Sequence, residues 1–199
     1  MKTSVNIFKY KNTPISFDLL ILLIFLFVNP LTAFIIIISI IIHEVAHGYI
    51  AIKRGYGLDK IHIGVFVSYA SILNIKNIKD DLVITLAGPV SNFLLAFVSV
   101  IFLVFLENTI FKEFFAQLVV LNLIFGTINM IPILPLDGGH ILKDILLLRG
   151  KENALLITHR VSIIVAFLLL WLTLSYGLFI LSIILFFAIF NSYKEIRKK

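Results

Sequence analysis

The sequence predicts an all-α polytopic membrane protein with about six transmembrane helices and a short β strand or hairpin at the membrane edge between the second and third spans. Three observations predict this fold class: the composition, the spacing of the apolar runs and the placement of the basic residues. Of the 199 residues, 60% are hydrophobic and 14% are charged, and the mean hydropathy is +1.09. A soluble domain carries roughly 25% charged residues. An apolar surface this large has to face lipid.

Six apolar runs, bounded by charges or turn residues, are the candidate spans. They cover residues 15–28, 31–52, 82–106, 114–133, 161–174 and 176–190. The first, fifth and sixth runs are short, and the residues at 29–30 and 175–177 predict tight turns between spans. No small-residue cleavage site of the usual kind follows the first run, so we expect this run to be retained rather than removed as a signal peptide.

The basic residues orient these spans, because positively charged loops stay in the cytoplasm. All but one of the 17 Lys and Arg residues lie within residues 2–11, 53–79, 143–160 and 194–199. Lys112 is the exception. We therefore expect both termini in the cytoplasm, and the net charge of +6 is explained without a nucleic-acid partner.

Two segments interrupt the helical pattern. Residues 61–72 are rich in β-branched and aromatic side chains and partly alternate, which predicts a strand or short hairpin. Residues 132–139 contain two prolines and two glycines, which predict a rigid turn leading into the amphipathic stretch 140–148. Neither an internal repeat nor a linker is evident, so a single domain is expected over residues 1–199.

The clearest candidates for chemistry are His43 and His47, with Glu44 between them. Residues four apart stand on one helix face, so both imidazoles can bind one Zn²⁺ while the Glu reaches a metal-bound water as general base. The chain has no cysteine, so a metal must be held by His, Asp or Glu. A charged side chain within a span costs roughly 2.5–3.5 kcal/mol. Three ionisable residues within a span therefore need a partner that compensates this cost, and a bound metal ion is such a partner. We prefer this interpretation to a chance occurrence of the pattern.

A hydrolytic zinc keeps three protein ligands and one open position, so a third ligand must lie elsewhere. The candidates are Asp137, His140, His62, His159 and Glu107. The expected topology takes Glu107 to the opposite side of the membrane, whereas spans two and four end on the same side, just after His47 and just before Asp137. His62 on the presumed strand and His159 at the start of span five have simpler roles as solvated or capping groups. Asp137 is therefore preferred, and His140 is the alternative.

These residues resemble the site-2 protease family of intramembrane zinc metalloproteases. Three motifs carry the resemblance, in chain order: His43-Glu44-Val45-Ala46-His47, Gly88-Pro89-Val90-Ser91-Asn92 and the segment from Asn129 to Gly139. The resemblance implies Zn²⁺ as cofactor, Glu44 as the catalytic residue and His43, His47 and Asp137 as the metal ligands. It is greatest for the sporulation-type members, which remove the membrane-associated pro-sequence of a sigma factor. We expect no CBS domain of the kind that those members often carry.

The resemblance also implies that three residues position the substrate: Asn129, Pro135 and Asn92. In the family, an Asn at the place of Asn129 is thought to steady the substrate or the tetrahedral intermediate. A role in helix packing is the simpler reading of this residue. Asn92, with the Gly88-Pro89 pair before it, is also typical of a kink and a close helix contact.

The implied activity is hydrolysis of a peptide bond in or near the membrane segment of a membrane-associated protein. Glu44 would take a proton from the attacking water and deliver it to the leaving amine, with the metal polarising the carbonyl. The strand around 63–72 could pair with an extended substrate. The alternative function is an inactive metal-binding membrane regulator or a metal carrier, although a carrier site does not require a Glu beside the first His. Membrane inhibitor or regulator proteins are further candidate partners.

Overall fold

A computed structural model of the chain describes residues 4–10, 13–64, 69–107 and 109–198. It divides into two compact units, residues 1–127 and residues 128–199. The first unit holds a β sheet and the long helices α2 and α3, and the second holds α5, α6 and α7. The single domain expected over residues 1–199 stays a prediction.

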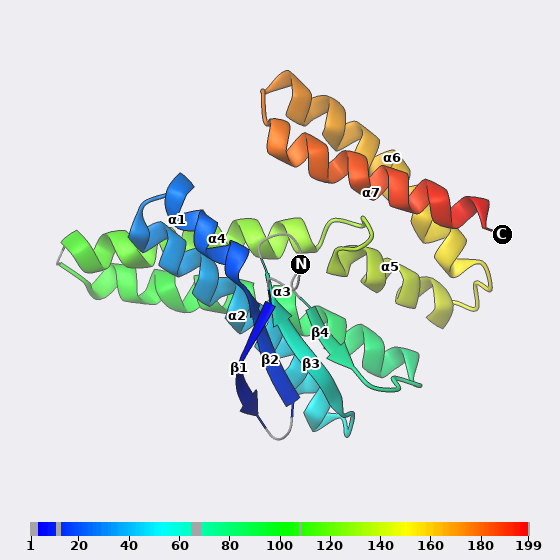
Figure 1. The fold of residues 1–199 in the computed structure, drawn as a ribbon, viewed down its shortest axis with the longest axis horizontal. Helices are drawn as coiled ribbons and strands as arrows, with labels where there is room; N and C mark the ends of the chain where they lie inside the picture. The colour runs from blue at the N-terminus through cyan, green and yellow to red at the C-terminus, as the bar shows by residue number, and fades with distance from the viewer. Residues whose placement is uncertain (1–3, 11–12, 65–68, 108, 199) are drawn as a thin grey trace. The chain divides into compact units, whose positions relative to one another are not determined.

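The sheet of the first unit has four strands in the order β1-β2-β3-β4 (Figure 1). The strands are β1 (Ser4–Tyr10), β2 (Thr13–Asp18), β3 (Leu58–Ile63) and β4 (Tyr69–Ile72). β1 and β4 pair antiparallel with their neighbours, whereas β2 and β3 run parallel. The predicted strand or hairpin after span two is therefore confirmed as β3 and β4, although residues 65–68 between them lie outside the described residues.

The first predicted span, residues 15–28, is not one helix. It comprises β2, a 3-10 helix η1 (Leu19–Leu23) and α1 (Ile24–Phe27). A four-residue helix is about 6 Å long and cannot cross a hydrocarbon core of about 30 Å. The run begins with an alternation of apolar and polar residues, Ile15-Ser16-Phe17-Asp18, which is the period of a strand. The backbone of β2 bonds to β1 and β3, so the sheet satisfies it without a helix.

Four helices among the described residues are long and apolar enough to cross a membrane. They lie in α2 (Pro30–Lys53), α3 (Ile78–Phe105), α4 (Thr109–Asn129) and α6 (Ala154–Ser175), which correspond to predicted spans two to five. The sixth predicted run lies in α7 (Phe179–Arg197), so the count of six spans is not confirmed.

Local sequence explains where the two site-bearing helices of the first unit begin. At the start of α2, the Asn29 side chain accepts a hydrogen bond from the backbone N–H of Thr32 at 2.8 Å, and Pro30 occupies the first helical position. At the start of α3, the Asn77 side chain accepts from the N–H of Lys79 at 2.9 Å. Two acidic residues follow in the first turn of α3, where the helix dipole favours negative charge.

The apolar core of the first unit joins the N-terminal segment to α2 and to the sheet. Ile21 is buried against Ile37, Ile40 and Ile41 of α2 and against Leu58 and Ala70 of β3 and β4. Because these contacts fix one face of α2, the helix that carries the His-Glu-His motif is held by the sheet as well as by α3.

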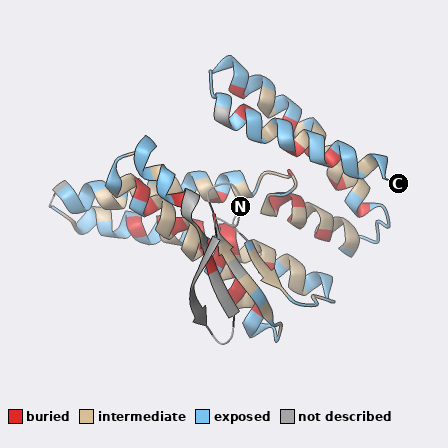
Figure 2. Ribbon diagram, in the orientation of Figure 1, coloured by how far each residue is buried: buried red, intermediate tan, exposed pale blue. Residues whose placement is uncertain are grey.

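The second unit is helical. α5 (Asp137–Leu148) packs on α6, and α6 and α7 form a helical hairpin whose turn contains Gly177 at φ +70°. Its core is formed by Ile133, Ala166 and Ala188. Exposed and half-buried residues otherwise dominate α6 and α7 (Figure 2), and they include Phe167 and Trp171. Apolar side chains this exposed on a long helix are suited to lipid, as expected for an integral membrane protein.

Candidate metal centre

The second half of α2 buries three ionisable side chains, and the first half of the helix is apolar. His43 is 7% exposed, Glu44 5% and His47 8%. The two histidines lie one turn apart and face α3, whereas Val45 between them is exposed. The spacing of four therefore places both imidazoles on the protein side of the helix, as the motif predicts.

The two rings are held through their Nδ1 atoms. His43 Nδ1 lies 2.6 Å from the amide oxygen of Asn92, and His47 Nδ1 lies 2.7 Å from the backbone carbonyl oxygen of Ile84. A carbonyl oxygen only accepts hydrogen bonds, so each Nδ1 must carry the hydrogen. In the neutral ring, Nε2 is then left with its lone pair, which is the state in which a histidine binds a metal.

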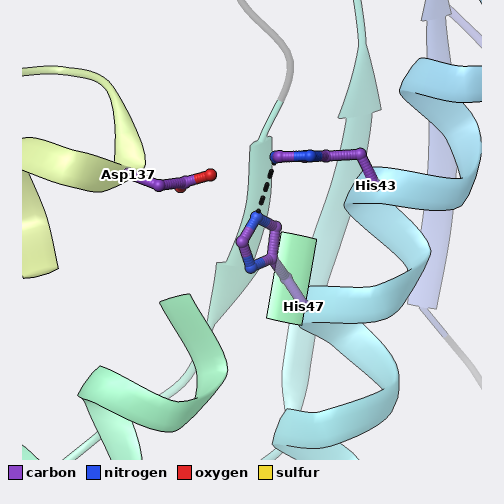
Figure 3. Close-up of side chains that lie close together, drawn as sticks. All are labelled: His43, His47 and Asp137. Carbon is purple, nitrogen blue, oxygen red and sulfur yellow. Dashed lines mark hydrogen bonds between the residues drawn. The ribbon is translucent and has the colours of Figure 1, made fainter. Parts of the chain in front are cut away.

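The two Nε2 atoms approach each other to 3.1 Å (Figure 3). This distance would suit a hydrogen bond, but with both hydrogens on Nδ1 neither neutral ring can donate from Nε2. The two lone pairs then repel each other, and a cation bound to both removes the repulsion. Two nitrogens on one tetrahedral Zn²⁺, with bonds of about 2.0–2.1 Å, lie roughly 3.3 Å apart. The separation of the Nε2 atoms therefore fits two ligands of one metal ion.

Gly88 provides the space for this pair. A Cβ atom on Gly88 would lie 2.3 Å from His47 Nε2 and 2.6 Å from His43 Nε2. Any other residue at this position of α3 would occupy the volume in front of the metal-binding atoms. The close helix contact expected at the Gly88-Pro89 pair is confirmed, and its purpose is to admit two imidazoles.

The remaining motif residues lie in the second unit. Asp137 is the first residue of α5 and is half-buried, and it is the third side chain drawn in Figure 3. The next residue, Gly138, is packed closely against the preceding turn, since a Cβ on it would lie 2.3 Å from the Ile131 carbonyl oxygen. Asn129 is the last residue of α4 and is half-buried, and Pro135 is exposed in the turn before α5.

The other candidates for a third ligand have different surroundings. His62 in β3 bonds through Nδ1 to the Ser16 hydroxyl at 3.0 Å, and its ring lies tilted against that of Tyr69 with the centroids 5.3 Å apart. His159 in α6 lines a cavity of about 200 Å³, whose lining also includes Glu195. Glu107 is exposed after the end of α3, and His140 is half-buried on α5.

The sequence reasoning missed one buried residue at this site. Asn122 in α4 is fully buried and donates its amide nitrogen to Ser39, while its oxygen accepts from Asn92. The signal that could have found it is an amide side chain in the middle of the apolar run 114–133. Such a group needs hydrogen bonds inside the protein.

The chain matches a known protein family. The model of peptidase family M50 matches residues 31–114 and 105–172. The zinc metalloprotease MJ0392 of Methanocaldococcus jannaschii is 28% identical over 213 residues, which cover 99% of this chain and 62% of the relative. The chain thus spans 62% of that relative's length. The putative zinc metalloprotease YwhC of Bacillus subtilis is 27% identical over 151 residues, 58% of this chain and 69% of the relative.

A solved structure has the same fold. The site-2 protease from Methanocaldococcus jannaschii superposes with a TM-score of 0.71 at 24% sequence identity, covering 97% of this chain and 95% of the other. The family resemblance expected from the three motifs is therefore confirmed.

Proposed function

The chain belongs to peptidase family M50, and from this premise we propose that it is a zinc metalloprotease that hydrolyses a peptide bond in or near the membrane segment of a membrane-associated protein. One observation carries the proposal: two buried imidazoles, each tied through Nδ1, bring their Nε2 atoms to 3.1 Å, and a buried Glu44 directly follows the first of them in the chain. A metal carrier would need the two imidazoles but not the neighbouring Glu.

The ligand set in this proposal is His43, His47 and Asp137. The geometry within the first unit supports His43 and His47 as ligands, and the family motif implies Asp137 as the third. Two nitrogens and one carboxylate oxygen are a ligand set that catalytic zinc sites use, and they leave a fourth position for water. The relatives named as zinc metalloproteases support zinc as the metal.

Within this proposal each side chain has a separate task. Bound zinc would supply a Lewis acid that polarises the scissile carbonyl and lowers the pKa of a bound water. Glu44, on the same helix as the two histidines, accepts the proton of the attacking water and returns it to the leaving amine. Asn92 and the carbonyl of Ile84 keep both rings in the Nδ1–H tautomer, so that Nε2 stays unprotonated.

The test is the Glu44→Gln variant, co-expressed with candidate membrane-tethered pro-proteins. Gln keeps the shape of Glu but cannot act as base, so hydrolysis should fall by at least about 100-fold. Zinc content, measured by metal analysis of the purified protein, should stay equal to wild type. Cleavage by the variant at the wild-type rate would contradict the proposed role of Glu44. Zinc binding without cleavage of any candidate by wild type would favour the inactive regulator or carrier.

For the substrate, we propose pairing along β4. A helix hides its carbonyls in its own hydrogen bonds, so a substrate helix must extend locally before attack. In the part of the chain that the structure describes, β4 pairs only with β3, which leaves its other edge available to an added strand. A proline at whichever of Ala70 and Ser71 points its N–H away from β3 should slow cleavage if that edge is used, because it removes a backbone donor from the free edge alone.

The orientation and the biological role also belong to this proposal. The placement of the basic residues supports cytoplasmic termini and an active site toward the cytoplasm. Reporter fusions after Tyr10 and Lys198 should read cytoplasmic, and a fusion at Glu107 should read external. A cytoplasmic reading at Glu107 would contradict this orientation. Processing of a sporulation sigma factor, and control by a membrane inhibitor protein, stay predictions for the same co-expression experiment.

A further inference from the structure

A chain of hydrogen-bonded polar side chains runs from His43 into the apolar interior between α2, α3 and α4. Asn92 Oδ1 lies 2.6 Å from His43 Nδ1, and Asn92 Nδ2 lies 2.8 Å from Asn122 Oδ1. Asn122 Nδ2 in turn lies 2.9 Å from Ser39 Oγ. The side chains of Asn92, Asn122 and Ser39 are fully buried. Nothing in the proposed mechanism needs Asn122 or Ser39, although burying each of them costs free energy.

The far end of this chain fixes the direction of its hydrogen bonds. Asn122 also reaches the backbone carbonyl of Leu118 at 2.9 Å, and Ser39 reaches that of Ile35 at 2.7 Å. Both carbonyls can only accept, so Ser39 donates to Ile35 and Asn122 turns its NH₂ group toward Leu118. The Ser39 hydroxyl then accepts the second hydrogen of that NH₂ group, and Asn122 is left with its oxygen pointing toward α3.

This direction is passed on to the histidine. Because Asn122 offers an oxygen, Asn92 must turn its own NH₂ group toward it. The oxygen of Asn92 then faces His43 and accepts only from an Nδ1–H. In the opposite orientation, Asn92 would present a donor, and His43 would have to carry its hydrogen on Nε2, where it cannot bind a metal.

We propose that Asn122, together with Ser39, is a positioning residue that sets the tautomer of His43 through Asn92. This inference rests on the proposed function, because it takes His43 as a metal ligand. A role in helix packing alone would not require one amide orientation over the other. His47 provides the contrast, since its Nδ1 is held directly by the backbone of Ile84 and does not depend on Asn122.

The first readout is the imidazole ¹⁵N spectrum of the full-length, metal-free protein in detergent, labelled at histidine. In wild type, both His43 and His47 should show the Nδ1–H tautomer, and the loss of signals in a His43→Gln variant identifies His43. The Asn122→Leu variant should still fold, because Leu is favourable in an apolar helix. It lacks the oxygen that accepts from Asn92, so the amide of Asn92 is free to turn. The His43 signals should move toward the Nε2–H tautomer, while those of His47 stay unchanged.

The second readout is zinc affinity, measured by competition with a chelator. Asn122→Leu should weaken zinc binding by about tenfold, the lower end of what a group that orients a metal ligand contributes. Asn122→Asp should keep both the tautomer and most of the affinity, because a carboxylate still accepts from Asn92. If Asn122 only packed the helices together, Asn122→Asp would lose more zinc affinity than Asn122→Leu, because burying Asp costs more than burying Leu.

Ser99→Ala is the matched control for Ser39→Ala. Both serines are buried and donate to the carbonyl four residues earlier, but Ser99 bonds to Leu95 outside the chain described above. Only Ser39→Ala should shift the His43 signals, and by less than Asn122→Leu, because Leu118 still orients Asn122.

An unchanged His43 tautomer in Asn122→Leu overturns the inference. If that variant does not fold, Ser39→Ala measured beside Ser99→Ala decides in its place, since Ser39 contacts Asn122 and not His43, and an unchanged His43 tautomer in Ser39→Ala then overturns the inference. The tautomer is measured without metal or substrate. A failure of the tautomer proposal can therefore be told apart from a failure of the proposed protease function. A His43 signal that responds in a protein that neither binds zinc nor cleaves would sink the proposed function and leave this inference standing.

Discussion

Substituting Gly88 by Ala places a methyl group in front of both metal-binding nitrogens. The added Cβ would lie 2.3 Å from His47 Nε2, whereas an ordinary contact is roughly 3.5 Å. Ring and methyl group would therefore have to separate by about 1.2 Å. The rings are tied on their far sides by Asn92 and Ile84, so neither can retreat without stretching a hydrogen bond.

Two opposing terms decide the effect of Gly88→Ala on stability. Inside a helix, Ala is favoured over Gly by about 0.8–1.0 kcal/mol. Overpacking costs about 1–3 kcal/mol, and loss of one ring hydrogen bond costs about 0.5–1.5 kcal/mol. The net result is a destabilisation of about 0.5–3.7 kcal/mol, whereas helix propensity alone would give a small stabilisation. A displacement near 1 Å at the site should also cost about 100-fold in rate.

The assay is zinc affinity and thermal unfolding of purified Gly88→Ala beside Gly126→Ala. Gly126 is also a buried helical glycine, but a Cβ there would meet the ring edge of Phe93 at 2.8 Å rather than the imidazoles. Zinc affinity should fall by about tenfold or more in the first variant and stay near wild type in the second. A Gly88→Ala protein with unchanged zinc affinity and a higher melting temperature would refute the reasoning.

Three further predictions concern the ligands, the metal and a surface contact. Asp137→Asn should lower zinc content and remove activity, whereas His140→Ala should cost much less; metal analysis showing the reverse would make His140 the ligand. A chelator that strips zinc should abolish hydrolysis and added zinc should restore it, so activity that persists in metal-free protein would exclude a zinc enzyme. A hydrogen bond to Asp80 raises the pKa of the Tyr56 hydroxyl, so Asp80→Asn should lower it. Phenolate absorbance, compared with Tyr56→Phe, measures that change, and an unaltered titration would contradict the contact.

The parts of the fold and site that follow from local sequence could be predicted. Spans two to five need only length and hydropathy, and the two histidines need only the helical spacing of four. The strand character of residues 61–72 was likewise visible in β-branched and aromatic residues.

What depends on partners distant in the chain could not be predicted. For β2 the local signals, the alternation of residues 15–18 and the neighbouring strand β1, are outweighed by the apolar run that follows, and the parallel partner β3, with His62 opposite Ser16, is 46 residues away. The contact between Ser39 and Asn122 joins residues 83 apart, and no spacing rule connects them. The sequence likewise suggested a close contact at Gly88 but not that two imidazoles fill the space.

The parallel pairing of β2 with β3 has a consequence for the order of events during synthesis. Parallel strands need a crossover connection, and here that connection contains α2, the helix that carries the two histidines. Ser16 leaves the ribosome 46 residues before its partner His62. At 5–20 residues per second, this delay is roughly 2–9 s. During that time β2 has only β1 to pair with, and the whole of α2 is made before β3 is available. The N-terminal strands are thus made first but pair with β3 only after the helix that carries His43 and His47 has been made.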